Sequence, residues 1–474
     1  MVENLTRRLP TPEHSVSEKL TFAVRGRVDF SAALDLANKL DAEIRSHTLL
    51  KIAAKQNEVG LDSTFALDQA IRYAGRGRHV GMSSWPALVN FYGDLGDFEK
   101  ADRFRKRIEK PHRLLVDFKL VEAVARAGGD PQARLDAIES RLADTVVKHP
   151  PGSALHYCWL AETYHAIGRN PTPTLSKALE IAEKEEGHFS TVAQSFAKIG
   201  MFKEAVDVAK KLKRASRGEY YEDKTRTLYE IAKHQVKSGD LEGAIQTVGI
   251  SRNRYYITSI IASAALFSAE NGQIPETLLE EAVGRTREIE NDIRVGKEKK
   301  IQLQDLATIW TEIALTQGLA GQDYQASFNQ AIDRANVVTD TYYRITDLIG
   351  IYRAKFKLGQ FDTEILLKSL ELADKILEEK QHAELAGGFQ LLAYEDLAEV
   401  AVDTGNFDLA TEVINRFPES DYMRAELLAY LGAEMVRRGL TTDEINNLSS
   451  EQMLEIYQGN DQATKDALSF LRAS

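Results

Sequence analysis

The sequence predicts an all-helical fold, an α-solenoid of about 11–12 stacked antiparallel helical hairpins. Three observations lead to this prediction. Glycines recur at intervals of 32 to 49 residues, the apolar residues before them follow helical spacing, and the chain of 474 residues contains only 11 Pro. Because each interval has the length of one helical hairpin, a single repeat array explains the chain better than several unrelated domains.

A six-residue turn motif marks the best repeats. It begins with Gly, continues with a polar or flexible residue and an apolar one, and ends with Ala: Gly96 to Ala101, Gly200 to Ala205, Gly239 to Ala244 and Gly405 to Ala410. The same ladder includes Gly60, Gly128, Gly168, Gly272, Gly321, Gly359 and Gly439. We expect each glycine to end a first helix with a positive φ and the next polar residue to cap the second helix. The alanine would let the two helices pack closely.

Upstream of the glycines, apolar residues recur with helical periodicity, as in Trp85, Leu88, Val89 and Tyr92 before Gly96. A basic residue also stands fifteen positions before several glycines: Arg45, Lys224, Arg344 and Arg424. This position lies at the start of a first helix, near the end of the preceding helix. We therefore expect the cation to contact the negative end of that helix dipole.

The apolar pair before the glycine, the aromatic residue two after it and the alanine five after it resemble tetratricopeptide repeats, most clearly over residues 82 to 110, 154 to 183 and 186 to 250. The resemblance implies a right-handed superhelix with a ligand in a concave groove lined by first helices. Transferred residue by residue, that groove would contain Asn90, Cys158, Glu162, His165, Arg226, Tyr229, Lys233, Lys237, Arg353, Lys357, Glu395, Glu399 and Asp403. It would be basic in the middle and acidic near the end. Pro86 stands where some family members carry a lysine that clamps a peptide C-terminus.

Four segments are expected along the chain. Residues 1–16 are polar and form a flexible arm or N-terminal cap, residues 17–148 and 153–440 carry the repeats, and residues 441–474 form capping helices. The two repeat blocks are separated at His149-Pro150-Pro151-Gly152, because two prolines and a glycine do not fit a helix interior.

No motif in the sequence carries chemistry. A P-loop, a paired-histidine zinc motif and a Cys-x-x-Cys pair are all lacking. His149, His156, Cys158 and His165 could suggest a metal or a nucleophile, but the two helical histidines stand nine residues apart and Cys158 lies between aromatic residues. We expect Cys158 to belong to the core, and we expect no catalytic residue, metal or cofactor.

The charge balance bears on partners and compartment. A net charge of -11 opposes general affinity for nucleic acid. Two basic clusters could nevertheless bind an anion, one along the second helix at residues 103–113 (Arg103, Arg105, Lys106, Arg107, Lys110, Arg113) and one at residues 210–217 (Lys210, Lys211, Lys213, Arg214, Arg217). Solvated helix ends, whose cations favour the C-terminal dipole, explain both clusters better. One cysteine and no apolar stretch long enough to cross a bilayer predict a cytoplasmic protein without membrane insertion.

These observations predict a non-catalytic scaffold that binds a partner protein or peptide. Two alternatives stay open: a nucleic-acid-binding helical array resembling pentatricopeptide proteins, and an enzyme with an α/α architecture. The net acidity argues against the first, and the absence of converging polar residues argues against the second. The sequence leaves the oligomeric state open.

Overall fold

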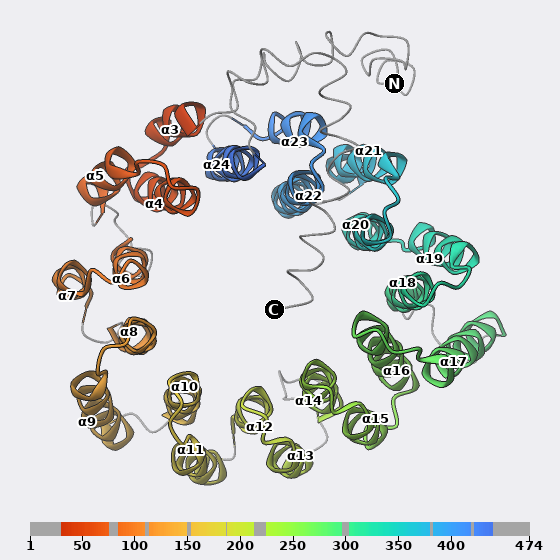
Figure 1. Ribbon diagram of the computed structural model, residues 1–474, viewed down its shortest axis with the longest axis horizontal. Coiled ribbons are helices and arrows are strands. Elements are labelled where there is room, and N and C mark those ends of the chain that lie inside the picture. Colours follow the sequence, from red (N-terminus) through yellow and green to blue (C-terminus); the bar gives the residue numbers. More distant parts are fainter. Residues whose placement is uncertain are drawn as a thin grey trace. The chain divides into compact units, whose positions relative to one another are not determined.

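The computed structural model describes residues 30–74, 84–109, 113–148, 153–185, 187–212, 224–295, 303–379, 383–418 and 421–438. Over these residues the chain forms 22 α-helices and no strand. The helices belong to two compact units (Figure 1): unit 1 consists of Met1–Ser84 and Ala335–Ser474, and unit 2 of Trp85–Arg334. The prediction of an all-α array of helical hairpins is confirmed.

Unit 1 is built from both ends of the chain. It contains α3 (Phe30–Lys39), α4 (Ala42–Glu58), α5 (Thr64–Tyr73), α20 (Thr341–Lys357), α21 (Thr363–Glu379), α22 (Ala383–Asp403), α23 (Phe407–Ile414) and α24 (Tyr422–Arg437).

Unit 2 is continuous in sequence. It contains α6 (Trp85–Asp94), α7 (Phe98–Arg105), α8 (Arg113–Arg126), α9 (Gln132–Lys148), α10 (Ser153–Ala166), α11 (Thr172–Glu185), α12 (Phe189–Lys198), α13 (Phe202–Lys211), α14 (Lys224–Ser238), α15 (Leu241–Gly249), α16 (Arg254–Glu270), α17 (Glu276–Arg294) and α18 (Leu303–Leu319). The helix α19 (Gln325–Asn336) spans the boundary between the units.

One turn geometry joins the helices of each hairpin. All ten ladder glycines among the described residues have positive φ values, between 73° and 84°. The residue after each glycine donates its backbone N–H to the carbonyl five positions earlier, at 2.7–3.0 Å. This is the hydrogen bond that satisfies an otherwise free carbonyl at a helix C-terminus. The sequence-based assignment of these ten glycines is confirmed, and Gly439 lies outside the described residues.

In the four hairpins with the six-residue motif, the residue after the glycine directly precedes the second helix, as predicted. In the other six hairpins the second helix begins four positions after the glycine, so the prediction was wrong there. The side chains of Asp97 and Asp240 each accept a backbone N–H three positions later, at 3.1 Å, and Asn406 accepts one at 3.4 Å. The motif alanines, Ala101, Ala205, Ala244 and Ala410, are fully buried. A larger side chain at these positions would push the two helices of a hairpin apart.

Arginine side chains cap the preceding helix, as the spacing predicts. Arg45 donates from Nε and Nη2 to the Leu40 carbonyl at 3.0 and 2.5 Å, and Arg344 donates to the Val338 carbonyl at 3.0 and 2.6 Å. Arg424 reaches the Phe417 carbonyl at 3.2 Å. The guanidinium therefore satisfies carbonyls that follow a second helix and lies at the negative end of its dipole.

The basic cluster at residues 103–113 does not lie along one helix, so that part of the sequence interpretation is wrong. The helix α7 ends at Arg105, and Pro111 follows in the sequence. Arg113 begins α8 and donates to the Ile108 carbonyl at 2.7 Å, while Arg105 pairs with the buried Asp117. Both cations thus serve the fold. In the second cluster, Lys210 and Lys211 pair with Asp207 and Glu183, and residues 213–217 lie outside the described residues.

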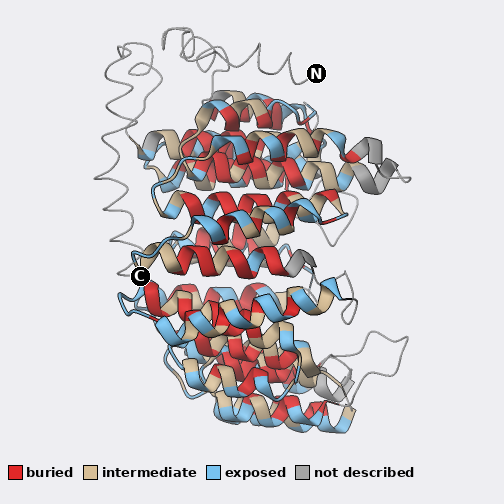
Figure 2. Cartoon of the chain, turned by 90° about the vertical axis from the view of Figure 1, so that its right-hand side faces the viewer, coloured by how far each residue is buried: buried red, intermediate tan, exposed pale blue. Residues whose placement is uncertain are grey.

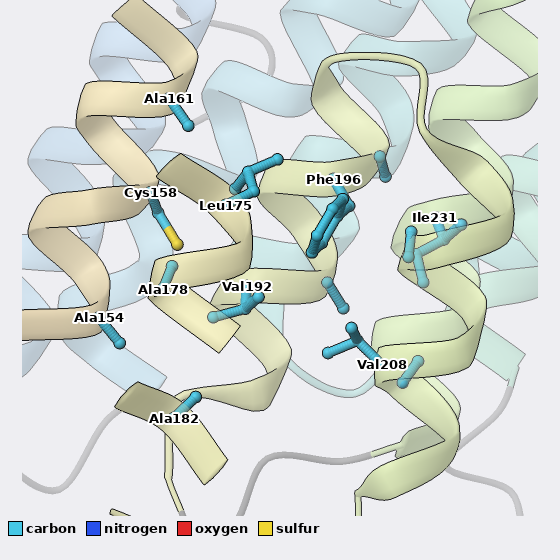
Figure 3. Packing of buried hydrophobic residues seen from close by; sticks show 14 of the residues in the cluster. Ala154, Cys158, Ala161, Leu175, Ala178, Ala182, Val192, Phe196, Val208 and Ile231 are labelled. Atoms are coloured by element: carbon cyan, nitrogen blue, oxygen red, sulfur yellow. The ribbon is translucent and has the colours of Figure 1, made fainter. Parts of the chain in front are cut away.

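Buried residues recur along one side of helix after helix (Figure 2). In unit 2, one core cluster joins α10 to α14 and includes Ala161, Leu175, Phe196 and Ile231 (Figure 3). Within each unit, first helices also pack on first helices: α6, α8, α10, α12, α14, α16 and α18 in succession in unit 2, and α20, α22, α24 and α4 in unit 1. Each hairpin therefore buries its apolar faces only when its neighbours are present.

The first and last described helices share one hairpin, which we call the terminal hairpin. The first helix α24 packs against α3 and α4, and α3 takes the place of its second helix. The small residue Gly432 faces the Phe30 ring, and Arg437 Nη2 lies 2.6 Å from Glu58 Oε2. The Arg45 cap on α3 repeats the cap that Arg344 and Arg424 provide elsewhere. The first and last described helices thus complete one repeat.

The predicted segment boundaries stay predictions. Residues 1–16, 149–152 and 441–474 lie outside the described residues. The division into compact units falls elsewhere, after Ser84 and after Arg334.

The glycine turns can be tested with a matched pair of substitutions in unit 2. Gly96→Ala adds a Cβ that meets no neighbour but stands on a backbone with φ +75°. We expect it to lower the free energy of unfolding by about 1 kcal/mol through backbone strain. Gly284→Ala, inside α17 with open space around it, should instead raise that free energy by about 0.5–1 kcal/mol. Urea unfolding followed by circular dichroism measures both, and equal effects would contradict the turn assignment.

The terminal hairpin predicts a long-range effect of Phe30. Phe30→Ala removes the ring that packs on Gly432, so we expect a loss of about 3 kcal/mol of unfolding free energy in unit 1. Amide exchange should accelerate in α24, far away in sequence. Phe65→Ala is the control, since Phe65 is 55% exposed and its removal should change the stability by less than about 0.5 kcal/mol. Unchanged exchange in α24 would argue against the shared hairpin.

Candidate binding surface

The predicted groove residues share one register on the first helices. Asn90, Glu162, Lys233, Arg353 and Glu399 each stand six positions before a positive-φ glycine. We call the side of the first helices that carries this register the first-helix face. Glu122 occupies the same register on α8 and was not among the predicted residues.

Hydrogen bonds between side chains join neighbouring first helices. In unit 2, Ser195 Oγ donates to Glu162 Oε1 at 2.7 Å, Thr163 Oγ1 donates to Glu122 at 3.4 Å, and Ser263 Oγ lies 3.0 and 3.2 Å from the two oxygens of Glu312. In unit 1, Tyr342 Oη donates to Asp396 Oδ2 at 3.5 Å. A carboxylate on one hairpin thus accepts from a hydroxyl on a neighbouring hairpin, which helps to fix their relative register.

In unit 2, the helix α14 brings four of the predicted residues to one side: Arg226, Tyr229, Lys233 and Lys237. Tyr229 stacks on Tyr256 of α16, with 4.5 Å between ring centroids, and its hydroxyl lies 3.1 Å from Ser259 Oγ. Lys233 Nζ lies 5.5 Å from the Tyr229 ring centroid and 3.3 Å from Glu230 Oε2. Arg226 and Lys237 are exposed. This helix presents cations beside an aromatic pair.

The other predicted residues of unit 2 have different roles. Glu162 bridges α10 and α12, because it also accepts from Lys198 Nζ at 3.1 Å. His165 is exposed at the end of α10. Asn90 is half-buried, and its side-chain carbonyl oxygen has no hydrogen-bond partner among the described residues.

In unit 1, four carboxylates gather on the neighbouring helices α22 and α24. We call Glu395, Asp396, Glu399 and Glu426 the acidic face. Two of these were predicted, and the structure adds Asp396 and Glu426. Lys51 Nζ of α4 lies 2.5 Å from Glu426 Oε2, and no other member of the acidic face has an ion pair within 4.0 Å among the described residues.

Burial and mutual repulsion raise the pKa values of these carboxyl groups. Desolvation is the main cause for all four. For Glu399 the negative charges of Glu395, Asp396 and Asp403 raise the pKa further, and for Glu395 those of Asp396 and Glu426 do so. The charge of Arg353 on α20 lowers the pKa of Asp396 and Glu399, and Lys51 lowers that of Glu426. The fold therefore holds like charges together with incomplete compensation.

Three further predicted residues complete the comparison. Arg353 and Lys357 are exposed on α20, and only Arg353 acts on the acidic face. Asp403 accepts from the Tyr430 hydroxyl of α24. The residues that were missed had a signal in the sequence: Glu312 interrupts the buried run Ile309, Trp310, Ile313 and Ala314, and Glu426 stands between the buried Ala425 and Leu427. A charge inside an apolar helix run marks a buried or partnered carboxylate.

Cys158 belongs to the core and not to the first-helix face, so its placement in the groove was wrong. Its side chain points into the cluster of unit 2 (Figure 3), because the residue lies on the side of α10 that packs against α11 and α12. Burial raises the pKa of this thiol to about 12, so it stays protonated and unreactive at neutral pH. His156 packs edge-on against Trp159.

Neither a metal centre nor a membrane span is found in the part of the chain that the structure describes. Over those residues, no group of three or more His, Cys, Asp or Glu side chains is placed to hold a metal ion. None of the described helices combines the length and apolar character needed to cross a bilayer.

Comparisons with known proteins show no family. No protein-family model matches the chain, and no curated protein matches it. Among solved structures, the chain is similar to Ton1535 from Thermococcus onnurineus NA1, with 17% identity, a TM-score of 0.32, and coverage of 74% of this chain and 99% of that one. It is also similar to a circular tandem repeat protein with novel repeat topology and enhanced subunit contact surfaces, with 13% identity, a TM-score of 0.26, and coverage of 94% and 95%.

The acidic face predicts a pH effect on stability. Because its carboxyl groups have raised pKa values in the folded protein, the fold binds their protons more tightly than the unfolded chain does. The stability of unit 1 should therefore fall as the pH rises from the ordinary carboxyl range towards neutrality. Glu395→Gln with Glu399→Gln should reduce this fall and raise the unfolding free energy at pH 7.5 by about 0.5–1 kcal/mol.

Thermal unfolding at pH 5 and pH 7.5 measures this effect. Glu371→Gln in α21 is the control, because that side chain is also half-buried but does not belong to the acidic face. A pH dependence that is the same in the double variant and in the parent protein would contradict the repulsion inferred for the acidic face.

Proposed function

We propose that the protein is a binding or scaffolding module that holds a partner protein or peptide on its first-helix face, without catalytic turnover of its own. The helical repeat architecture supports this, because stacked hairpins place many side chains in one register along a continuous surface. The single cysteine, Cys158, favours a reducing compartment, and we place the protein in the cytoplasm as part of this proposal.

The observation that carries the proposal is the acidic face of unit 1. Four carboxylates stand on two neighbouring helices with raised pKa values, and only Glu426 has an ion pair among the described residues. Holding like charges together costs stability, so an arrangement of this kind indicates a role outside the fold. A cationic partner would remove the repulsion. We therefore propose a lysine- or arginine-rich segment of a protein as the ligand of this face.

Aromatic side chains border the acidic face. Tyr422 at the start of α24 is 37% exposed and lies near Glu426, and the partly exposed Tyr342 of α20 donates its hydroxyl to Asp396. Lys55 lies 5.0 Å from the ring centroid of Tyr430, which shows that an aromatic ring of α24 already accepts a cation. Exposed tyrosines beside carboxylates suit the aliphatic stems and charged ends of lysine and arginine.

The proposal predicts that neutralising the acidic face weakens binding. A fluorescent 20-residue peptide rich in lysine and arginine is titrated into the full chain and into Glu395→Gln/Glu399→Gln. Removing two charges should weaken the affinity roughly tenfold and reduce its salt dependence. The control variant Glu276→Gln/Glu280→Gln neutralises two exposed carboxylates on the second helix α17. Its affinity should stay within twofold of the parent, a change in binding free energy of about 0.4 kcal/mol or less.

Two outcomes would contradict the proposal. Equal loss of binding in both double variants would show that only net charge matters. Tight binding of a labelled single-stranded RNA at low salt, falling steeply as salt is added, would favour the nucleic-acid alternative instead. Affinity purification with the parent and the Glu395→Gln/Glu399→Gln variant in parallel then identifies the natural partner, as the protein recovered with the parent alone.

A further inference from the structure

Glu312 joins two neighbouring first helices at the end of the succession in unit 2. It stands on α18, which packs side by side with α16, and α16 packs on α14 (Figure 1). Its two oxygens lie 3.2 and 3.0 Å from the same hydroxyl, Ser263 Oγ. Protein atoms surround the carboxyl group, yet part of the residue remains in contact with solvent.

Glu312 differs from the other carboxylates that join first helices in unit 2. Glu162 pairs with Lys198 at 3.1 Å, and Glu122 pairs with Lys119 at 3.0 Å. Glu312 has no cation within 4.0 Å among the described residues. One hydroxyl donates one hydrogen bond, whereas an ionised carboxylate accepts several. The ionised form of Glu312 therefore has fewer hydrogen-bond donors than it can accept from, whereas the protonated form needs no cation to balance its charge.

The charged groups around Glu312 do not compensate its charge. Lys233 on α14 acts on it from a distance and favours the ionised form, while Glu270 on α16 opposes that form. Lys233 is held 3.3 Å from Glu230 and faces the Tyr229 ring. On α17, Glu290 Oε1 accepts hydrogen bonds from Trp310 Nε1 at 2.8 Å and from Arg334 Nε of α19 at 2.7 Å. Burial thus outweighs these charges and raises the pKa of Glu312 to about 7.

We propose that Glu312 is a proton-operated joint between two neighbouring hairpins of unit 2, closed when the carboxyl group is protonated and loosened when it ionises. In the protonated form the carboxyl group and Ser263 share one hydrogen bond across α16 and α18, with no charge to solvate. In the ionised form the charge must be hydrated or reached by Lys233, and either change separates side chains that pack at the contact of α16 with α18. The joint is independent of the acidic face, which belongs to unit 1.

The direction of the pH effect follows from the proton balance. The ordinary pKa of a glutamate is 4.5, and the folded protein raises that of Glu312 to about 7. The folded state therefore binds this proton more tightly than the unfolded chain. The contribution of Glu312 to stability is complete below pH 4.5 and is lost as the pH rises through 7. The joint would consequently respond within the physiological pH range.

Amide hydrogen exchange of the full chain, corrected for the intrinsic pH dependence, tests the proposal. Between pH 5.5 and pH 8 the opening of α16 and α18 in the parent should increase roughly tenfold or more, since each unit of pKa difference corresponds to a factor of ten. Glu312→Gln keeps the shape and lacks the charge, so its opening should change less than about twofold. Glu162→Gln is the matched control: it removes the charge of the equivalent carboxylate that accepts from Ser195, and it should keep the pH dependence of the parent.

A second measurement keeps the proposal testable if Glu312→Gln does not fold. The hydrogen bond from Ser263 lowers the pKa of Glu312, because it stabilises the ionised carboxylate. Ser263→Ala removes this bond, so the midpoint of the pH transition should move upward. Carboxyl ¹³C NMR of the parent should show one glutamate that titrates near pH 7 and moves in Ser263→Ala. The same pH dependence in the parent and in Glu312→Gln, or a transition that does not respond to Ser263→Ala, would overturn the proposal.

Discussion

The fold depends on one backbone conformation, the positive φ of the glycine that ends each first helix. This conformation turns the chain back within a few residues and lets the following N–H satisfy a carbonyl of the helix just completed. In the four hairpins with the six-residue motif, a buried alanine follows five residues after this glycine. Regular stacking of first helices, and hence the first-helix face, follows from this repeated turn.

The first-helix face carries unequal charge because each hairpin adds only a few side chains to it. Hydroxyl–carboxylate bonds such as Ser195 to Glu162 join neighbours, and lysines neutralise some of these carboxylates. Where the neutralising cation is lacking, as at Glu312 or Glu399, burial raises the pKa and the side chain becomes sensitive to protons or to a cationic partner. The carboxylates of the first-helix face are therefore of two kinds: those paired with a lysine, and those whose ionisation depends on pH or on a cationic partner.

Much of the fold could be predicted from the sequence, because its determinants are local. The ladder glycines, the Asp97 and Asp240 caps and the Arg344 cap depend on residues close in the chain, and all were confirmed. The candidate binding surface was harder to predict from the sequence. The helical register correctly brought Tyr229 and Lys233 together, but Asp396 and Glu426 become neighbours of Glu395 only through the packing of α22 on α24. The prediction of one basic helix over residues 103–113 was wrong, although Pro111 within that range was a local signal against it. The terminal hairpin was not predicted either, because no local sequence pattern in α3 indicates that it packs against α24.

The terminal hairpin has a consequence for the synthesis of the protein. The helix α3 ends at Lys39 and its partner α24 begins at Tyr422, so almost the whole chain is translated between them. At about 5–20 residues per second, a ribosome needs roughly 20–80 s to make that interval. During this time α3 and α4 can pack on each other and α4 on α5, but the sides of α3 and α4 that contact α24 lack that partner. We expect molecular chaperones to bind these earliest helices most. A truncated message that lacks the codons of α24 should yield a protein in which α3 and α4 are the destabilised helices.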